Sequence, residues 1–374
     1  MPAASRPSTT PRSVRPMVRD YSAFLPGGKP PRREPTALEG LGWGPAFASQ
    51  IDAGALTETP PVRVVAVHRS GLQVVGDGID ETIPPGPEAT VGDWLLYDRA
   101  RPRSSRVLER KSLIKRRAPG MGREVQLIAA NIDTVFVVTS CNQDFNVARL
   151  ERYFALAFEA GIEPVIVLTK ADLAEDPTPY VEEARKVSDR VPVVALDARG
   201  EEPTAALADW CKPGRTVAFL GSSGVGKSTL TNALLGTQAI ATQGIREDDA
   251  RGRHTTTRRE LHATPGGCLV LDTPGMRELQ LTNAAAGIAD VFEDIEALAA
   301  KCRFADCRHE TEPGCAVQTV IENDSLDPAR LARWRKLQAE DAFNSSSLAE
   351  RREKDRAFGK LVRSAVKAKA DRDR

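Results

Sequence analysis

Two short motifs stand in an order that most nucleotide-binding domains do not show. The sequence "TKAD" occupies residues 169–172, and "GSSGVGKST" occupies residues 221–229. The second motif matches the phosphate-binding pattern G-x-x-x-x-G-K-[ST]. The first matches a guanine-reading loop, which normally comes later in the chain. A doubly wound sheet binds its ligand at the carboxyl ends of its strands, whatever their order in the sequence. The two motifs therefore predict a circularly permuted nucleotide-binding domain.

The phosphate motif lies between the strand-like run "TVAFL" and a helix-like segment, which is the context that such a loop requires. Its glycines let backbone N–H groups point towards the phosphates, and the following helix N-terminus favours an anion. We expect Lys227 to reach the β- and γ-phosphates and to act in catalysis, and Ser228 to bind Mg²⁺. The predicted phosphate-binding residues are Gly221, Ser222, Ser223, Gly224, Val225, Gly226, Lys227, Ser228 and Thr229.

The motif "TKAD", formed by Thr169, Lys170, Ala171 and Asp172, predicts which base is bound. The Asp172 carboxylate can accept hydrogen bonds from guanine N1–H and the 2-amino group. Adenine has an acceptor at N1 and no 2-amino group, so it would leave the carboxylate unpaired. We expect Lys170 to lie along the base. Thr169 stands where Asn is commoner, so its contact with the base stays open.

The motif "DTPG" at residues 272–275 ends an apolar run about forty-five residues after the phosphate loop. We expect Asp272 to hold Mg²⁺ through water and the N–H of Gly275 to contact the γ-phosphate. Met276 follows, where many GTPases have a glutamine that orients water. A thioether cannot orient water, so we expect slow hydrolysis by the isolated protein.

The segment "RHTTT" offers a substitute for the missing glutamine. His254 precedes a run of threonines typical of the first switch loop, which makes it a candidate for catalysis, the role that the family resemblance described below favours. The alternative is an exposed histidine that orders only when a partner binds. Thr255 and Thr256 are both candidates for closing on Mg²⁺, and the sequence does not choose between them.

The sequence "CRFADCRHETEPGC" contains a potential metal site. Three thiolates and one imidazole form a closed tetrahedral set suited to one structural Zn²⁺, with no open position for catalysis. The spacing C-x₄-C-x-H-x₅-C departs from that of common zinc fingers. The predicted zinc ligands are Cys302, Cys307, His309 and Cys315.

The charge distribution favours a polyanionic partner. The net charge is only +1, but residues 98–123 hold ten Arg or Lys against two acids, and residues 351–374 hold ten against four. Such runs fit RNA contact, although they also occur as solvated faces. No apolar stretch approaches the roughly 18 residues that span a bilayer, and the N-terminal residues contain no apolar h-region, so we do not expect secretion. We therefore expect a cytoplasmic protein with no membrane partner, and we expect a monomer.

The motif order, together with "AANID" (129–133) and "GRHTTTRREL" (252–261), resembles the circularly permuted GTPases that depend on the small ribosomal subunit, the RsgA or YjeQ family. The resemblance covers roughly residues 60–320. It implies an N-terminal OB-fold, a permuted GTPase domain and a zinc domain with the same Cys/His pattern. It also implies binding to the small ribosomal subunit and its rRNA, and hydrolysis of GTP late in subunit maturation.

The predicted fold is α/β: a circularly permuted P-loop GTPase domain with an N-terminal OB-fold β-barrel and a C-terminal zinc-binding helical domain. Two other functions stay open, namely an RNA-binding scaffold whose nucleotide only sets shape, and an ATPase, which Asp172 disfavours. The predicted boundaries are a mostly disordered extension at 1–59, the OB-fold at 60–122, the GTPase domain at 123–288 and the zinc-binding domain with its basic tail at 289–374.

Overall fold

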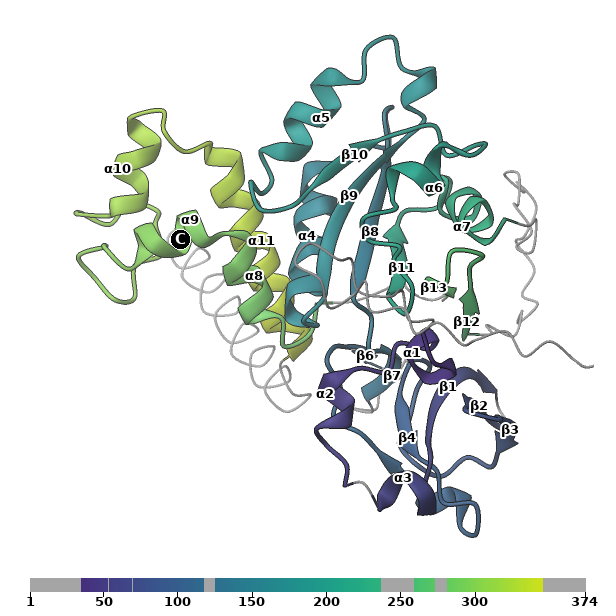
Figure 1. Ribbon diagram of the computed structural model, residues 1–374. Coiled ribbons are helices and arrows are strands. Elements are labelled where there is room, and N and C mark those ends of the chain that lie inside the picture. The colour runs from purple at the N-terminus through teal and green to yellow at the C-terminus, as the bar shows by residue number, and fades with distance from the viewer. Residues whose placement is uncertain are drawn as a thin grey trace, which may run out of the picture. The chain divides into compact units, whose positions relative to one another are not determined.

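The fold is taken from a computed structural model, which describes residues 35–52, 54–68, 70–117, 125–236, 259–272 and 281–345. By its contacts the chain divides into residues 1–36 and a compact unit that begins at Ala37. The compact unit contains a β region, an α/β region and a group of C-terminal helices (Figure 1). No helix in the described part of the chain is long and apolar enough to cross a membrane.

The α/β region is built on six neighbouring strands in the order β10-β9-β8-β11-β13-β12. Neighbouring strands run parallel, except that β12 pairs with β13 in the antiparallel sense. The parallel strands have continuous apolar sequences, which are typical of strands covered on both faces. The strands are β8 (Thr134–Ser140), β9 (Glu163–Thr169), β10 (Val193–Ala195), β11 (Thr216–Gly221), β12 (Arg259–Ala263) and β13 (Leu269–Asp272).

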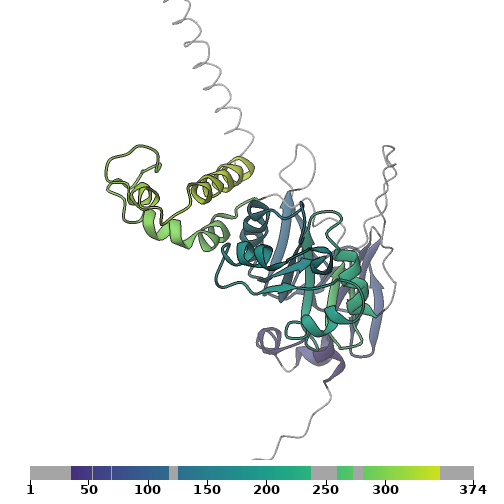
Figure 2. The ribbon, with the colours of Figure 1, turned by 90° about the horizontal axis from the view of Figure 1, so that it is seen from above.

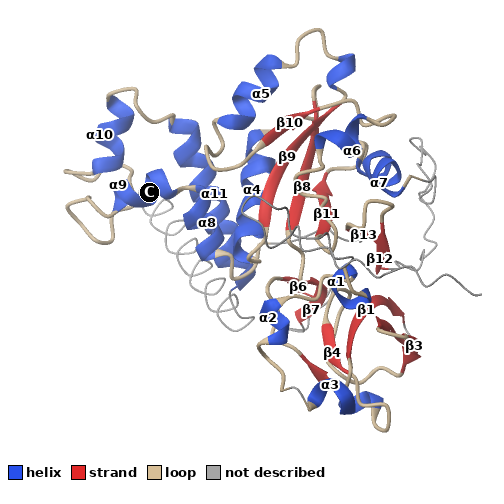
Figure 3. Ribbon diagram, in the orientation of Figure 1, coloured by secondary structure: helices blue, strands red, loops and turns tan. Residues whose placement is uncertain are grey.

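Alternate residues of these strands enter two separate cores, as the two-residue period of a strand requires. On β8, Val135 and Val137 pack with α4 (Val147–Glu159) and α5 (Thr178–Arg185). The intervening residues of β8 pack on the other face with the region of α6 (Glu202–Ala206) and α7 (Lys227–Leu235). Figure 3 shows the helices on both sides of the sheet.

Helix α4 begins at a local capping signal. The side chain of Asn146 accepts a hydrogen bond from the backbone N–H of Arg149, which satisfies one of the helix's free donors. Leu150 and Phe154 then lie one turn apart on the buried face. Gly161 follows the helix with a positive φ of 71°, a conformation that glycine adopts without strain.

The N-terminal β region is antiparallel and joins the α/β sheet directly. Strand β1 (Pro61–His68) pairs with β2 (Gly71–Gly76), with β4 (Trp94–Leu96) and with β12 of the α/β region. Strand β3 (Ile79–Ile83) pairs with β2, and β5 (Arg106–Val107) pairs with β4. A separate hairpin is formed by β6 (Leu113–Arg117) and β7 (Val125–Ala130).

A short stretch before β1 is ordered against this β region. It contains α1 (Ala37–Gly40) and α2 (Pro45–Ala48), and α3 (Ala55–Glu58) follows it. Phe47 is buried, and its ring and that of Trp43 pack against Trp94 of β4. These residues fall within the segment that the sequence predicts to be mostly disordered. The stretch contributes five apolar side chains to a cluster with Trp94 and its neighbours: Leu38, Leu41, Trp43, Phe47 and Ile51.

The motif "AANID" connects the β region to the α/β region. Asn131 donates from Nδ2 to the carbonyl of Gly92, and Asp133 accepts a hydrogen bond from the backbone of Thr216 on β11. Arg63 of β1 is fully buried and donates to the carbonyls of Leu41, Gly92 and Asn131. Burial lowers the pKa of Arg63 to about 10, so it remains charged at neutral pH.

The C-terminal helices form a group of their own beside α4 (Figure 2). They are α8 (Ala285–Val291), α9 (Glu293–Ala299), α10 (Ala316–Glu322) and α11 (Pro328–Ser345). Gly287 of α8 meets α4 so closely that an added Cβ would lie 2.0 Å from the carbonyl oxygen of Ala155. The absence of a side chain there allows the two helices to touch along their backbones.

Candidate nucleotide site and metal cluster

Three predicted motifs begin where parallel strands end. Thr169 is the last residue of β9, Gly221 the last of β11 and Asp272 the last of β13. These strands lie in the order β9-β8-β11-β13 and run in the same direction. Their carboxyl ends therefore share one edge of the sheet, which we call the nucleotide rim, although the motifs are far apart in sequence.

The phosphate loop has the backbone geometry that its glycines permit. Gly221, Gly224 and Gly226 have φ values of 150°, 79° and 95°. At Gly221 an added Cβ would lie 2.3 Å from the carbonyl oxygen of Val138, so only glycine fits. Helix α7 begins at Lys227, immediately after Gly226. Ser222 and the following loop residues therefore lie at the N-terminus of a helix, where backbone donors favour an anion.

The ammonium of Lys227 turns back over the phosphate loop. It donates to the carbonyl of Gly221 at 2.9 Å and also to the carbonyl of Ser222. Ser228 and Thr229 follow it in the first turn of α7. The lysine predicted to contact phosphate thus lies over the loop that would surround the phosphates.

The base-reading loop is tied directly to the phosphate loop. Thr169 is fully buried. Its hydroxyl donates to the carbonyl of Val225 at 2.6 Å, and the carbonyl oxygen of Thr139 lies 3.2 Å from the same hydroxyl. Lys170 adopts a left-handed conformation with φ of 57°, and a short 3₁₀ helix (Ala171–Leu173) follows. The threonine at the position where asparagine is commoner therefore acts on the neighbouring loop through its hydroxyl.

The predicted base reader has a cationic neighbour that the sequence reasoning missed. Arg199 follows β10, and its Nη2 lies 2.5 Å from Oδ2 of Asp172. Its Nε donates to Asp197 at 3.1 Å, so one guanidinium joins two carboxylates. The signal in the sequence was the "DARG" segment after the apolar run that precedes the phosphate loop.

A second missed residue approaches the phosphate loop from α4. Arg149 donates from Nη1 to the hydroxyl of Ser222 at 2.6 Å. Nothing in the local sequence distinguishes this arginine from an exposed helix residue, because the contact joins positions that are 73 residues apart.

A hollow of about 1220 Å³ lies beside α6 and α7. Its walls come from the segment around Arg199, from α7 at Thr229, and from the turn at Thr264 between β12 and β13. Of the predicted nucleotide-binding residues only Thr229 lines it, and the turn at Thr264 precedes β13, so the hollow does not coincide with the nucleotide rim.

Several predicted residues lie outside the described part of the chain. They are His254, Thr255, Thr256, Gly275 and Met276. The basic tail at 351–374 and part of the basic stretch at 98–123 also lie outside it. Of the predicted magnesium ligands, Ser228 and Asp272 are described, at the start of α7 and the end of β13.

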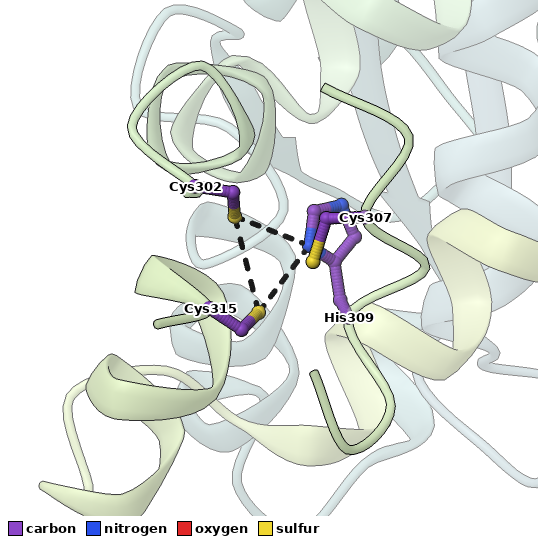
Figure 4. A group of neighbouring side chains, drawn as sticks. All are labelled: Cys302, Cys307, His309 and Cys315. Atoms are coloured by element: carbon purple, nitrogen blue, oxygen red, sulfur yellow. Dashed lines mark hydrogen bonds between the residues drawn. The ribbon is translucent and has the colours of Figure 1, made fainter. Parts of the chain in front are cut away.

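The four predicted zinc ligands lie together between α9 and the start of α10 (Figure 4). Nδ1 of His309 is 3.5 Å from Sγ of both Cys302 and Cys315, and those two sulfurs are 3.9 Å apart. All four ligand atoms, including Sγ of Cys307, lie within 4.8 Å of one another. We call this group the Cys/His cluster.

The geometry of the Cys/His cluster fits a tetrahedral metal. Zinc–sulfur bonds of about 2.3 Å at tetrahedral angles place neighbouring ligand atoms about 3.8 Å apart. Burial lowers the pKa of His309, with the charge of Arg335 acting in the same direction, so the imidazole is neutral and able to bind a cation. With four protein ligands present, the set leaves no position for a reacting water.

The sequence model of the RsgA GTPase family matches residues 107–282. A protein named small ribosomal subunit biogenesis GTPase RsgA 2, from Vibrio parahaemolyticus, is 48% identical over 341 residues, which cover 90% of this chain and 94% of the relative. The RsgA protein of Mesorhizobium japonicum is 49% identical over 317 residues, covering 83% of this chain and 91% of the relative.

Solved structures support the same relationship. YjeQ from Thermotoga maritima is 26% identical, with a TM-score of 0.54, and the match covers 74% of this chain and 96% of that one. YloQ, described as a circularly permuted GTPase, is 23% identical with a TM-score of 0.51, covering 77% of this chain and 97% of that one, and shows the same fold. The reversed motif order, the shared rim and these relatives lead to one conclusion: the chain belongs to the RsgA family of circularly permuted GTPases.

Proposed function

We propose that this protein hydrolyses GTP to GDP and phosphate, that the small ribosomal subunit stimulates this reaction, and that it acts late in maturation of the subunit. One observation gives this proposal most of its support. The hydroxyl of Thr169 holds the base-reading loop against the phosphate loop at Val225, so a single nucleotide can contact both. The names of the relatives from Vibrio and Mesorhizobium support the link to the small subunit.

Each loop has a proposed role. The backbone of the phosphate loop surrounds the phosphates, and Lys227 neutralises charge that develops on them. Asp172 accepts hydrogen bonds from guanine, which requires Arg199 to share or leave that carboxylate. Mg²⁺, when bound, neutralises the β- and γ-phosphates, and Ser228 and Asp272 are its proposed ligands. The remaining proposed contacts are Lys170, Ala171, Ser223, Gly224, Gly226, Thr229 and Gly275.

The first switch loop has proposed roles that depend on residues outside the described part. We assign His254 to positioning or activating water, because Met276 cannot do so. We also assign one of Thr255 and Thr256 to Mg²⁺. Slow turnover by the isolated protein and faster turnover on the subunit are the expected consequences.

The Cys/His cluster has a structural role in this proposal. Cys302, Cys307, His309 and Cys315 hold one Zn²⁺ that fixes the loop between α9 and α10. The β region at 60–122, proposed as an OB-fold, and the basic stretch that begins at 98 contact rRNA backbone. The protein acts as a cytoplasmic monomer.

The test is the rate of hydrolysis with purified ribosomal subunits. GTP and ATP turnover are measured with the small subunit, with the large subunit and with neither. We expect stimulation of GTP hydrolysis by the small subunit alone. Equal rates under all three conditions would favour an RNA-binding scaffold, and equal use of ATP and GTP would remove the assignment of Asp172.

A further inference from the structure

Arg149 occupies an unusual position for a charged residue on a helix surface. It lies in the first turn of α4, where Asn146 caps the helix through the backbone N–H of Arg149 itself. Its guanidinium donates to the hydroxyl of Ser222 at 2.6 Å and to the carbonyl of Asp144 at 3.4 Å. In the described part of the chain, both acceptors are neutral oxygens. The guanidinium therefore serves to hold the phosphate loop and not to satisfy a carboxylate.

Ser222 receives a second cation. The ammonium of Lys227 donates to the carbonyl of Ser222, while Arg149 holds its hydroxyl. Lys227 has three donors and places two of them on the carbonyls of Gly221 and Ser222, so contact with both the β- and γ-phosphates requires it to release at least one of these carbonyls. Release of the Ser222 carbonyl leaves Arg149 as the cation bound to that residue. The contact with Arg149 is thus placed where a change in phosphate occupancy alters the loop.

The other end of this path begins two residues along α4. Glu151 is fully buried, and its carboxylate accepts hydrogen bonds from Arg333 at 2.8 Å and from Arg330 at 3.3 Å, both on α11. Arg152 of α4 also pairs with Glu340 of α11 at 2.7 Å. Neighbouring residues of α4 therefore contact the phosphate loop and the C-terminal helix α11.

Helix α11 in turn contacts the Cys/His cluster. Arg335 donates to the backbone carbonyls of Arg308 and His309, each at 2.6 Å. The ring of Trp334 lies 5.6 Å from that of His309, and its indole N–H donates to Glu296 of α9. A displacement of α11 would therefore alter the contacts of His309, one of the four cluster ligands.

We propose that Arg149 is a positioning residue of the phosphate loop and that it transmits nucleotide occupancy through α4 to α11 and the Cys/His cluster. The proposal rests on the proposed use of GTP and adds the route by which nucleotide state reaches the C-terminal helices. The route runs through packed and hydrogen-bonded groups across the molecule, and does not need the chain segment that directly connects Asp272 to α8. Couplings carried by such networks change equilibria or rates by about 2- to 30-fold.

The experiment compares Arg149→Met, Arg149→Lys and a control, Arg185→Met, which removes an exposed arginine in the last turn of α5. Three quantities are measured on the full chain: GDP affinity, hydrogen exchange of α11 amides with GDP or a non-hydrolysable GTP analogue, and the kcat stimulated by the small subunit. In the wild type and the control, exchange of α11 should differ between the two nucleotides.

In Arg149→Met that difference should disappear and the stimulated kcat should fall by about 10-fold, with GDP affinity changed by less than about 3-fold. Arg149→Lys should recover part of both effects, because it keeps a cationic donor. The proposal is overturned if Arg149→Met keeps the exchange difference, if the wild type shows none, or if GDP affinity falls as far as kcat. Failure of the wild type to bind GDP at all would instead remove the proposed function.

Discussion

The nucleotide rim and the Cys/His cluster differ in what holds their functional groups. The rim is formed by strand ends whose preceding residues are deeply buried; every residue of β8 and β11 is buried. Between Cys302 and Cys315, by contrast, only His309 and Cys315 are buried, and both are cluster ligands. A sheet core positions the rim without ligand, whereas the cluster loop has too little apolar surface to order itself.

The difference predicts that the proposed metal is needed at the cluster and not at the rim. At the rim, removing one ligand-binding side chain should change binding or rate and leave the fold intact. At the cluster, removing one metal ligand should change the fold of the loop and leave nucleotide binding intact. The predictions below test this separation.

The largest effect should follow loss of the metal. Structural zinc contributes on the order of 10 kcal/mol to the folding of small domains. Elemental analysis should give one zinc per chain, and Cys307→Ser should lower zinc affinity by more than about 100-fold, since loss of a mere supporting hydrogen bond already costs about 10- to 100-fold. Proteolysis should then accelerate between residues 296 and 322 while GDP affinity stays unchanged. A metal-free protein that resists proteolysis there would contradict the comparison.

Lys227→Ala should give the next largest effect, at the rim. Its ammonium lies over the phosphate loop at the carbonyls of Gly221 and Ser222. Loss of one group that stabilises charge developing in the transition state lowers turnover by at least about 100-fold. Zinc content and the melting temperature should not change. A variant with normal kcat would show that this lysine does not act on phosphate.

Asp172→Asn should alter base preference. The carboxylate lies 2.5 Å from Arg199 and is the group that would accept two hydrogen bonds from guanine. An amide in its place can donate to the carbonyl that xanthine has at position 2. We expect preference for GTP over xanthosine triphosphate to fall by about 100-fold or more, measured by competition binding. An unchanged preference would assign base recognition to another residue.

Local sequence predicts the parts of the proposed site that depend on short motifs. The phosphate loop at 221–229, the base-reading loop at 169–172 and the four cluster residues are contiguous signals whose physical requirements are visible in the residues themselves. Strand direction then places the first two on one rim, and the structure confirms the predicted permuted α/β fold.

Contacts between distant segments were not predictable in this way. The pairing of Ala66 in β1 with Glu260 in β12 and the contact of Arg149 with Ser222 each join elements whose sequences give no sign of one another. The packing of residues 37–51 against the β region was not predicted from the sequence, for a related reason. Trp43 and Phe47 are too few to predict a core, and Phe47 becomes buried, and Trp43 partly buried, against Trp94.

The smallest effect should come from Thr169→Val, which tests how the rim is held. The hydroxyl of Thr169 donates to the carbonyl of Val225 at 2.6 Å, so valine removes the tie and leaves a buried carbonyl short of a partner. Such a loss costs about 1–2 kcal/mol. Because the tie acts on the loop backbone and not on the γ-phosphate, GTP and GDP affinities should both fall by about 5- to 30-fold, with their ratio unchanged.

Thr216→Val is the matched control for that variant. Thr216 lies in β11 and is also buried, but its hydroxyl has no hydrogen-bond partner among the described residues. Replacing an unpartnered buried hydroxyl with a methyl group should be neutral or stabilising, with no change in nucleotide affinity. Equal losses in the two variants would mean that the β-sheet, and not the tie between the loops, sets the affinity. A loss confined to Thr169→Val would show that the hydrogen bond between the base-reading and phosphate loops sets part of the nucleotide affinity, on a rim whose fold the sheet core maintains.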